Sequence, residues 1–157
     1  MTEPVIGKKI ADFNLEMTSE KTIKRSDLTG KYTVIYFYPK DSTPGCTTEG
    51  RDFRALYEQF QAINTEVYGV SKDSLKRHEN FKAKQEFPFE LISDPDETLC
   101  KIFDVIKLKK LYGREYMGIE RSTFLLNEKA ELIHEWRKVK VKGHAEEVLK
   151  IAQEAQE

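Results

Sequence analysis

The residue best placed for chemistry is Cys46, which stands between an apolar run and an amphipathic stretch. The run Val34 to Tyr38 is rich in β-branched and aromatic residues, as in a strand that is buried on both faces. Turn residues occupy 41–45, and an apolar stripe with helical spacing then extends from residue 53 to residue 60. We therefore expect Cys46 in or just before the first turn of a helix. Free N–H groups and the helix dipole favour a thiolate there.

Pro39, Thr43 and Cys46 form the pattern P-x-x-x-T-x-x-C, here PKDSTPGC. This pattern resembles the active-site signature of the peroxiredoxins, and the longer stretch YFYPKDSTPGCTTE is similar to the PrxQ, or bacterioferritin comigratory protein, subfamily. The resemblance covers nearly the whole chain, including FPFELISDPDETLCKIFDV and GIERSTFLLNEKAELIHEWRKVKVKGHAEEVL. It implies a thioredoxin-like fold and thiol-dependent reduction of hydrogen peroxide and organic hydroperoxides, without a prosthetic group.

Reduction of a peroxide requires a thiolate that attacks one oxygen, and hydrogen-bond donors for the charge that develops on the other. Cys46 is the predicted nucleophile. The Thr43 hydroxyl can act as donor and acceptor between the thiolate and the peroxide, and the N–H groups of Gly45 and Cys46 can donate to the peroxide. Pro39 and Pro44 would stiffen the turn and shield it from water.

Arg121 is the cation that this site still requires. It matches the family arginine that holds the thiolate and polarises the peroxide, and it precedes a predicted core strand. The alternative is an ordinary solvated arginine. Glu49, one helical turn after Cys46, is expected to anchor Arg121 or to cap the helix, and a solvated carboxylate is the alternative.

Cys100 is the only other cysteine. Many PrxQ proteins carry a resolving cysteine five residues after the peroxidatic one, where this chain has Arg51, and others carry it in the next helix, where residues 80–83 contain none. Cys100 adjoins apolar residues on a predicted helix, so we expect a structural thiol, with a resolving role as the alternative. The working hypothesis is a one-cysteine cycle. An external thiol (thioredoxin, glutaredoxin or glutathione) would attack the Cys46 sulfenic acid.

The remaining patterns predict the elements that position this site. We expect strands at 10–17 (an edge strand), 22–24, 34–38, 66–71, 89–93 and 122–126, and a closing hairpin strand within 131–139. Helices are expected from residue 46 to about 61, at 75–85, after an N-cap at Asp94, and after Gly143. The segment 107–118 is interpreted as a basic, aromatic loop or excursion from the fold, at the solvated rim of the active site. Alternating strands and helices predict one α/β domain over 1–157, with a mixed sheet covered by helices on both faces.

Composition excludes several other classes of protein. The 26 basic and 27 acidic residues nearly cancel, so we expect no nucleic-acid partner. No apolar stretch approaches the roughly 20 residues of a membrane helix, and the N-terminus does not read as a signal peptide, so we expect a cytoplasmic protein. His78, His134 and His144 lack the spacing of metal ligands, so no metal is expected. The resemblance suggests a monomer.

Two other functions are compatible with the same residues. Cys46 could belong to a peroxide sensor that passes its oxidation to a partner protein, which the absence of an obvious resolving cysteine would suit. Alternatively, the chain could be a thioredoxin-fold binding or chaperone module. The complete set of Pro39, Thr43, Cys46 and Arg121 argues against the second alternative.

Overall fold

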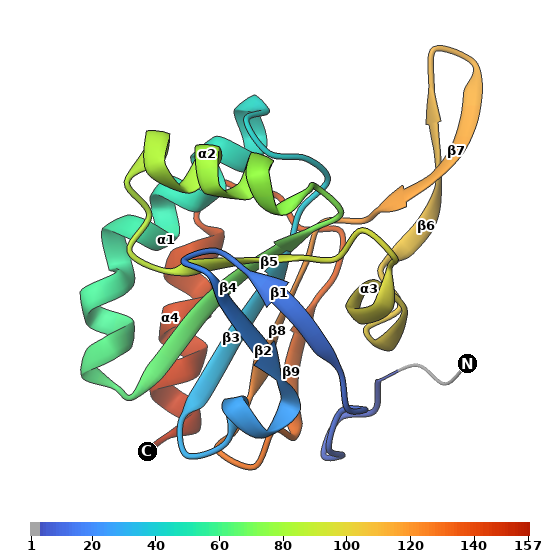
Figure 1. Cartoon of the computed structure of the whole chain (residues 1–157). Coiled ribbons are helices and arrows are strands. Elements are labelled where there is room, and N and C mark those ends of the chain that lie inside the picture. Colours follow the sequence, from blue (N-terminus) through green and yellow to red (C-terminus); the bar gives the residue numbers. More distant parts are fainter. Residues whose placement is uncertain (1–3) are drawn as a thin grey trace.

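The computed structural model describes residues 4–157 (Figure 1), so the expectation about a signal peptide falls partly on residues outside it. The strands are β1 (Asn14–Met17), β2 (Lys21–Lys24), β3 (Tyr32–Phe37), β4 (Thr65–Ser71), β5 (Glu90–Ser93), β6 (Ile106–Leu111), β7 (Arg114–Ile119), β8 (Ser122–Leu126) and β9 (Leu132–Trp136). The helices are α1 (Pro44–Ala62), α2 (Leu75–Gln85), α3 (Thr98–Ile102) and α4 (His144–Ala155), and a 3-10 turn, η1, spans Arg25–Leu28.

Seven strands form one mixed sheet in the order β2-β1-β5-β4-β3-β8-β9. The central strands β3, β4 and β5 are parallel, because helices α1 and α2 carry the chain back between them. Strands β1 and β8 run antiparallel to their central neighbours β5 and β3. The predicted thioredoxin-like α/β fold with a mixed sheet is therefore confirmed.

Strand β3 is buried on both faces, as its composition predicted. Val34 and Tyr36 pack in a cluster with side chains of α1, α2 and α4. Ile35 and Phe37 point to the opposite face, where they pack with side chains of α3, β1 and β2. The sheet thus separates two apolar cores, and α1 and α4 lie together on one side of it (Figure 1).

The N-terminal strands differ from expectation in one respect. Strand β1 is not an edge strand, because it pairs with β2 on one side and with β5 on the other. The short strand β2 is the edge. The Ser74 N-cap of α2 is confirmed, since its side chain accepts a hydrogen bond from the Arg77 N–H.

The predicted Asp94 N-cap is wrong. Helix α3 begins only at Thr98, after Glu97 in a left-handed conformation. The Glu97 N–H donates to the Asp94 carbonyl at 3.1 Å, so residues 94–97 form a turn with Pro95 in its favoured second position. The Asp94 carboxylate instead accepts from the Cys100 N–H at 2.8 Å.

Segment 107–118, predicted as a loop or excursion without strands, is an antiparallel hairpin of β6 and β7. Ile106 pairs with Ile119 at its base, and Leu111 pairs with Arg114 next to the turn. The hairpin extends away from the body of the protein (Figure 1), which leaves Tyr112 almost fully exposed. The sequence did not reveal the hairpin, because most side chains near its tip are exposed on both faces. Its strands therefore lack the alternation of apolar and polar residues that marks a half-buried strand.

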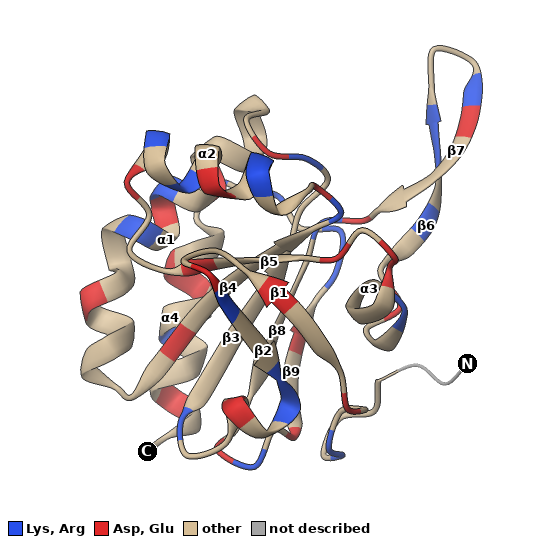
Figure 2. Ribbon diagram, in the orientation of Figure 1, with Lys and Arg blue, Asp and Glu red and all other residues tan. Residues whose placement is uncertain are grey.

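Charges of both signs are interspersed over the ribbon (Figure 2), as the near-zero net charge suggested. Over residues 4–157, none of the helices combines the length and the apolar character required to cross a bilayer.

Gly50 offers a test of how closely α1 packs against Phe87, which follows α2. A Cβ at this position would overlap the tip of the Phe87 ring, which is held edge-on to Phe81 and stacked on Phe89. Alanine normally favours a helix over glycine by about 1 kcal/mol, but overpacking a fixed ring costs about 1–3 kcal/mol. We therefore expect Gly50→Ala to lower the free energy of unfolding in urea by up to about 2 kcal/mol. The exposed Gln59→Ala serves as control, and a stabilised Gly50→Ala protein would contradict this packing.

Candidate active site

Cys46 lies in the first turn of α1, as predicted. The helix starts at Pro44, and its N-cap is Thr43 in an extended conformation. The Thr47 N–H donates to the Thr43 carbonyl at 2.9 Å, so the N–H groups of Gly45 and Cys46 precede the first bond of the helical ladder. The thiol is only 2% exposed. It therefore lies beside positively polarised backbone groups at a largely dehydrated position.

The sheet brings Arg121 to this helix from far along the chain. Strand β8 starts at Ser122, which pairs antiparallel with Phe37 at the carboxyl end of β3. Since Cys46 follows the same end of β3 after a short turn, the residue that precedes β8 lies next to the start of α1. The register of two strands thus places this arginine.

Arg121 contacts both Cys46 and Glu49. Its Nη2 lies 3.4 Å from the Cys46 Sγ, and its Nη1 donates to the Glu49 Oε1 at 2.6 Å. A Cβ on Gly45 would lie 3.2 Å from that Nη2, so glycine leaves the room that the guanidinium needs. Both partners raise the pKa of Arg121, which opposes the effect of its burial.

Glu49 is almost completely buried, and burial raises its pKa to about 7 despite the adjacent Arg121 charge. The arginine favours the carboxylate, but the loss of hydration outweighs this attraction. The Oε2 atom has no hydrogen-bond partner among the described residues. The charged form of Arg121 is thus favoured and that of Glu49 is not, because the guanidinium contacts two acceptors whereas the carboxyl has one donor.

Thr43 and Pro39 stand at the exposed side of the site. The Thr43 hydroxyl donates to the Lys40 carbonyl at 2.8 Å, so in this structure the Thr43 oxygen is free to accept but its proton is engaged. Pro39 borders a cavity of about 290 Å³ together with Lys109, Met117 and other residues of the β6–β7 hairpin. Burial and the Arg121 charge lower the pKa of Lys109. The hairpin therefore lies beside Pro39, with Lys109 near enough to the Arg121 guanidinium to respond to its charge.

Cys100 lies apart from this group. It is completely buried in the apolar core on the face of the sheet opposite Cys46. Burial and the nearby Asp94 carboxyl raise its pKa, which disfavours a thiolate. Both cysteines are free thiols.

Sequence reasoning missed the residues that hold loop 39–46, which we call the peroxidatic loop because Cys46 is its predicted nucleophile. Asp41 looked like an ordinary turn residue, but its side chain is buried and bonded to Tyr38 and His78. A signal was present in α2, where His78, Phe81 and Gln85 share the one buried stripe of an otherwise charged helix.

The site therefore has a buried thiol at the start of a helix, held by an arginine and backed by a carboxyl, on a thioredoxin-like fold. The model of the AhpC/TSA family matches residues 6–135. Peroxiredoxin Bcp of Xanthomonas campestris is 53% identical over 152 residues, which cover 95% of this chain and 94% of the relative. Peroxiredoxin Bcp of Bacillus subtilis is 51% identical and covers 97% of both chains.

Solved structures of PrxQ and bacterioferritin comigratory proteins have the same fold as this chain. A cysteine mutant of PrxQ from Xylella fastidiosa superposes with a TM-score of 0.94 at 46% identity and covers both chains completely. The Xanthomonas campestris bacterioferritin comigratory protein, studied for alkyl peroxide reduction, superposes with a TM-score of 0.89 at 50% identity, over 92% of each chain.

This chain belongs to the AhpC/TSA family, within its Bcp/PrxQ group of peroxiredoxins. It is accordingly a thiol peroxidase.

The raised pKa of Glu49 predicts a specific dependence of stability on pH. A group whose pKa is higher in the folded than in the unfolded protein stabilises the fold at low pH, and this contribution is lost as pH rises to the folded value. The stability of the wild type relative to Glu49→Gln should therefore fall by about 3 kcal/mol as pH rises from 4 to 8. Urea unfolding across this range measures the difference.

The exposed Glu58→Gln on the same helix controls for the chemical change alone. A difference between wild type and Glu49→Gln that stays constant, or that grows with pH, would contradict the buried, weakly compensated carboxyl.

Proposed function

We propose that this thiol peroxidase reduces hydrogen peroxide and organic hydroperoxides at Cys46. The observation that carries the proposal is the 3.4 Å contact between the Arg121 Nη2 and the Cys46 Sγ, at the N-terminus of α1. An arginine at this distance favours the thiolate and remains beside it when a peroxide binds. The relative from Xanthomonas campestris, studied for alkyl peroxide reduction, supports the same substrate class.

In the first step the thiolate attacks one oxygen of ROOH. The S–O bond forms as the O–O bond breaks, and the alkoxide takes a proton and leaves as ROH, so that Cys46 becomes a sulfenic acid. Arg121 and the Gly45 and Cys46 N–H groups would stabilise the charge on the leaving oxygen. The free acceptor side of the Thr43 oxygen would receive the peroxide O–H, and Pro39 and Pro44 would shape the pocket.

In the second step an external thiol attacks the sulfenic sulfur. This forms a mixed disulfide and releases water, and a second thiol then restores Cys46. The one-cysteine cycle is supported by the position of Cys100, which is buried on the other face of the sheet. A disulfide requires Cα atoms within about 7 Å, so pairing these cysteines would require extensive unfolding.

The reductant, the oligomeric state and the compartment complete the proposal. We infer that thioredoxin, glutaredoxin or glutathione supplies the electrons to a monomer in the cytoplasm. A sensor or a binding module is not favoured, because the relatives bear the names of peroxidases and share nearly the whole chain.

Cysteine variants test the cycle directly. Stopped-flow mixing of the reduced protein with hydrogen peroxide, followed by intact mass, should show rapid formation of a sulfenic acid in the wild type and in Cys100→Ser. Cys46→Ser should react no faster than a free thiol in solution. A Cys46–Cys100 disulfide in high yield would contradict the one-cysteine cycle.

Arg121→Met tests the polarising cation. Loss of one charged donor at a developing anion costs about 100- to 1,000-fold in rate, so we expect a drop of that size in the rate constant for hydrogen peroxide. Arg114→Met on the exposed hairpin is the matched control. Because the single change leaves Glu49 buried without its partner, the double variant Arg121→Met with Glu49→Gln keeps the test valid if the single variant unfolds. An unchanged rate in a folded variant would rule out this role for Arg121.

A further inference from the structure

The peroxidatic loop contains a strained residue. Ser42 has a φ of 63°, in the left-handed region that residues other than glycine rarely adopt, and this costs about 1 kcal/mol or more. It lies between Asp41 and Thr43, at the point where the chain turns from β3 towards α1. The conformation that presents Thr43 and Cys46 therefore requires contacts that hold the loop on its preceding side.

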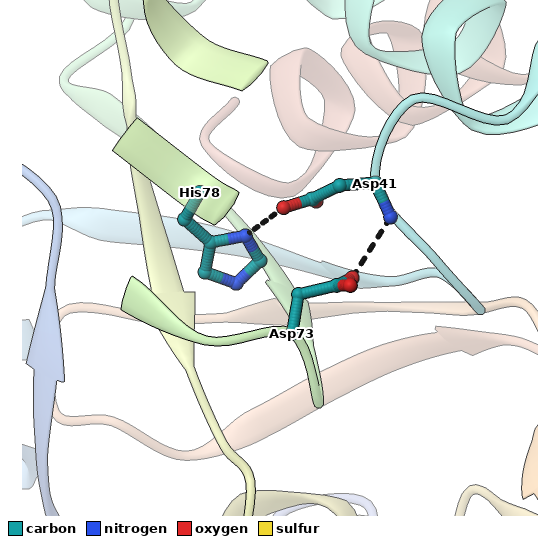
Figure 3. A group of neighbouring side chains, drawn as sticks. All are labelled: Asp41, Asp73 and His78. Carbon is teal, nitrogen blue, oxygen red and sulfur yellow. Dashed lines mark hydrogen bonds and ion pairs between the residues drawn. The ribbon is translucent and has the colours of Figure 1, made fainter. Parts of the chain in front are cut away.

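Asp41 supplies these contacts with an almost completely buried carboxylate. Figure 3 shows this carboxylate facing the His78 ring, and the Asp41 backbone nitrogen facing the Asp73 carboxylate. The Tyr38 hydroxyl donates to the Asp41 Oδ1 at 2.6 Å, and the Nδ1 of His78 lies 2.6 Å from the Asp41 Oδ2. Burial and the Asp41 charge raise the pKa of Tyr38 well above its ordinary value, so the phenol remains a donor. The backbone N–H of Asp41 also donates to the Asp73 Oδ2 at 2.8 Å.

His78 connects this loop to the rest of the fold. Its Nε2 lies 2.9 Å from the Ile92 carbonyl, which can only accept, so Nε2 carries a hydrogen. A further proton then lies between His78 Nδ1 and the Asp41 carboxylate. The buried pair is neutral overall whichever atom holds that proton, and it joins the loop to α2 and β5.

Asp73 holds the loop backbone from a second direction. Its Oδ2 accepts the Asp41 N–H and the Ser71 hydroxyl, and its Oδ1 accepts from the Arg77 Nε at 3.0 Å. The carboxylate is thus aligned by groups of β4 and α2 before it meets the loop. Both the side chain and the backbone of Asp41 are fixed by elements outside the loop.

Asp41, Asp73 and His78 also offer ligand atoms within 4.8 Å of one another. Two ligands about 2.1 Å from a shared ion keep roughly 3 Å or more between them, but Asp41 and His78 approach to 2.6 Å. Each carboxylate already accepts hydrogen bonds from protein donors. A proton, and not a metal ion, therefore accounts for the cluster.

We propose that His78 and Asp41 are positioning residues for peroxide reduction, through the hydrogen bond that fixes the strained peroxidatic loop over α2. This inference rests on the proposed role of Cys46. Neither side chain reaches the substrate. The bond sets where the loop leaves β3, and hence where the Thr43 oxygen and the first N–H groups of α1 stand relative to Arg121. Apolar residues could fill this volume at lower desolvation cost, so packing alone does not require the buried pair.

Two substitutions of His78 separate the loss of its hydrogen bond to Asp41 from the loss of the packed imidazole ring. The amide of His78→Asn lies near the position of Nδ1 and can still donate to Asp41, whereas the amide of His78→Gln lies near Nε2 and can donate only to Ile92. Each variant loses the ring and keeps one hydrogen bond. His78→Gln leaves the buried Asp41 Oδ2 without a donor, so we expect it to be the less stable of the two in urea, and the rates are compared under conditions in which both variants are folded. A misplacement of about 1 Å costs about 100-fold in rate, so His78→Gln should react with hydrogen peroxide 10- to 100-fold more slowly and His78→Asn within about threefold of wild type.

A second measurement reports on the surroundings of Cys46 in the absence of peroxide. The rate of Cys46 alkylation by iodoacetamide, measured against pH in the full-length protein, should have its midpoint at higher pH in His78→Gln than in His78→Asn. Equal rates and equal midpoints in the two folded variants would overturn the positioning role and leave a structural histidine. A wild type that alkylates normally but is inert to peroxide would instead overturn the proposed function of Cys46, so the two failures are distinguishable.

Discussion

The site depends on one guanidinium that is shared between two acceptors. Arg121 is largely withdrawn from water, and it contacts the Cys46 sulfur and the Glu49 carboxyl at once. In a medium with few water molecules such contacts are stronger than at a surface, but an unpaired charge there is also costly. The glycine at position 45, the first turn of α1 and the register of β8 on β3 are the geometric conditions that let this arginine enter.

The central sheet also divides the chemistry of the two thiols. Cys46 belongs to the core beneath α1, α2 and α4, beside backbone donors and a cation. Cys100 belongs to the other core, where an acidic neighbour and burial keep it protonated. The two cysteines thus have opposite environments, because α1 and α3 cover opposite faces of the sheet.

Much of this arrangement was predictable from local patterns. The strand before Cys46 and the helix after it follow from an apolar run, a cluster of turn residues and a stripe with helical period, all within one stretch of chain. The Ser74 cap of α2 and the closing hairpin after Leu126 were predictable for the same reason. Where short-range preferences agreed with the tertiary environment, the expected and observed boundaries differ by a few residues at most.

The sequence by itself determined the turn that carries Cys46 and the order of the strands and helices outside the β6–β7 hairpin, because backbone preference and hydrophobic period act over neighbouring residues. Only the tertiary structure decided which partners meet. Glu49 could have been a solvated carboxylate, but the pairing of β8 with β3 brings Arg121 to it. His78 has no metal-like spacing in the sequence, and the packing of α2 on the sheet buries it against Asp41. Asp94 shows the same effect in reverse: it is not the N-cap residue of α3, but the fold brings its carboxylate to the Cys100 N–H in the first turn of that helix.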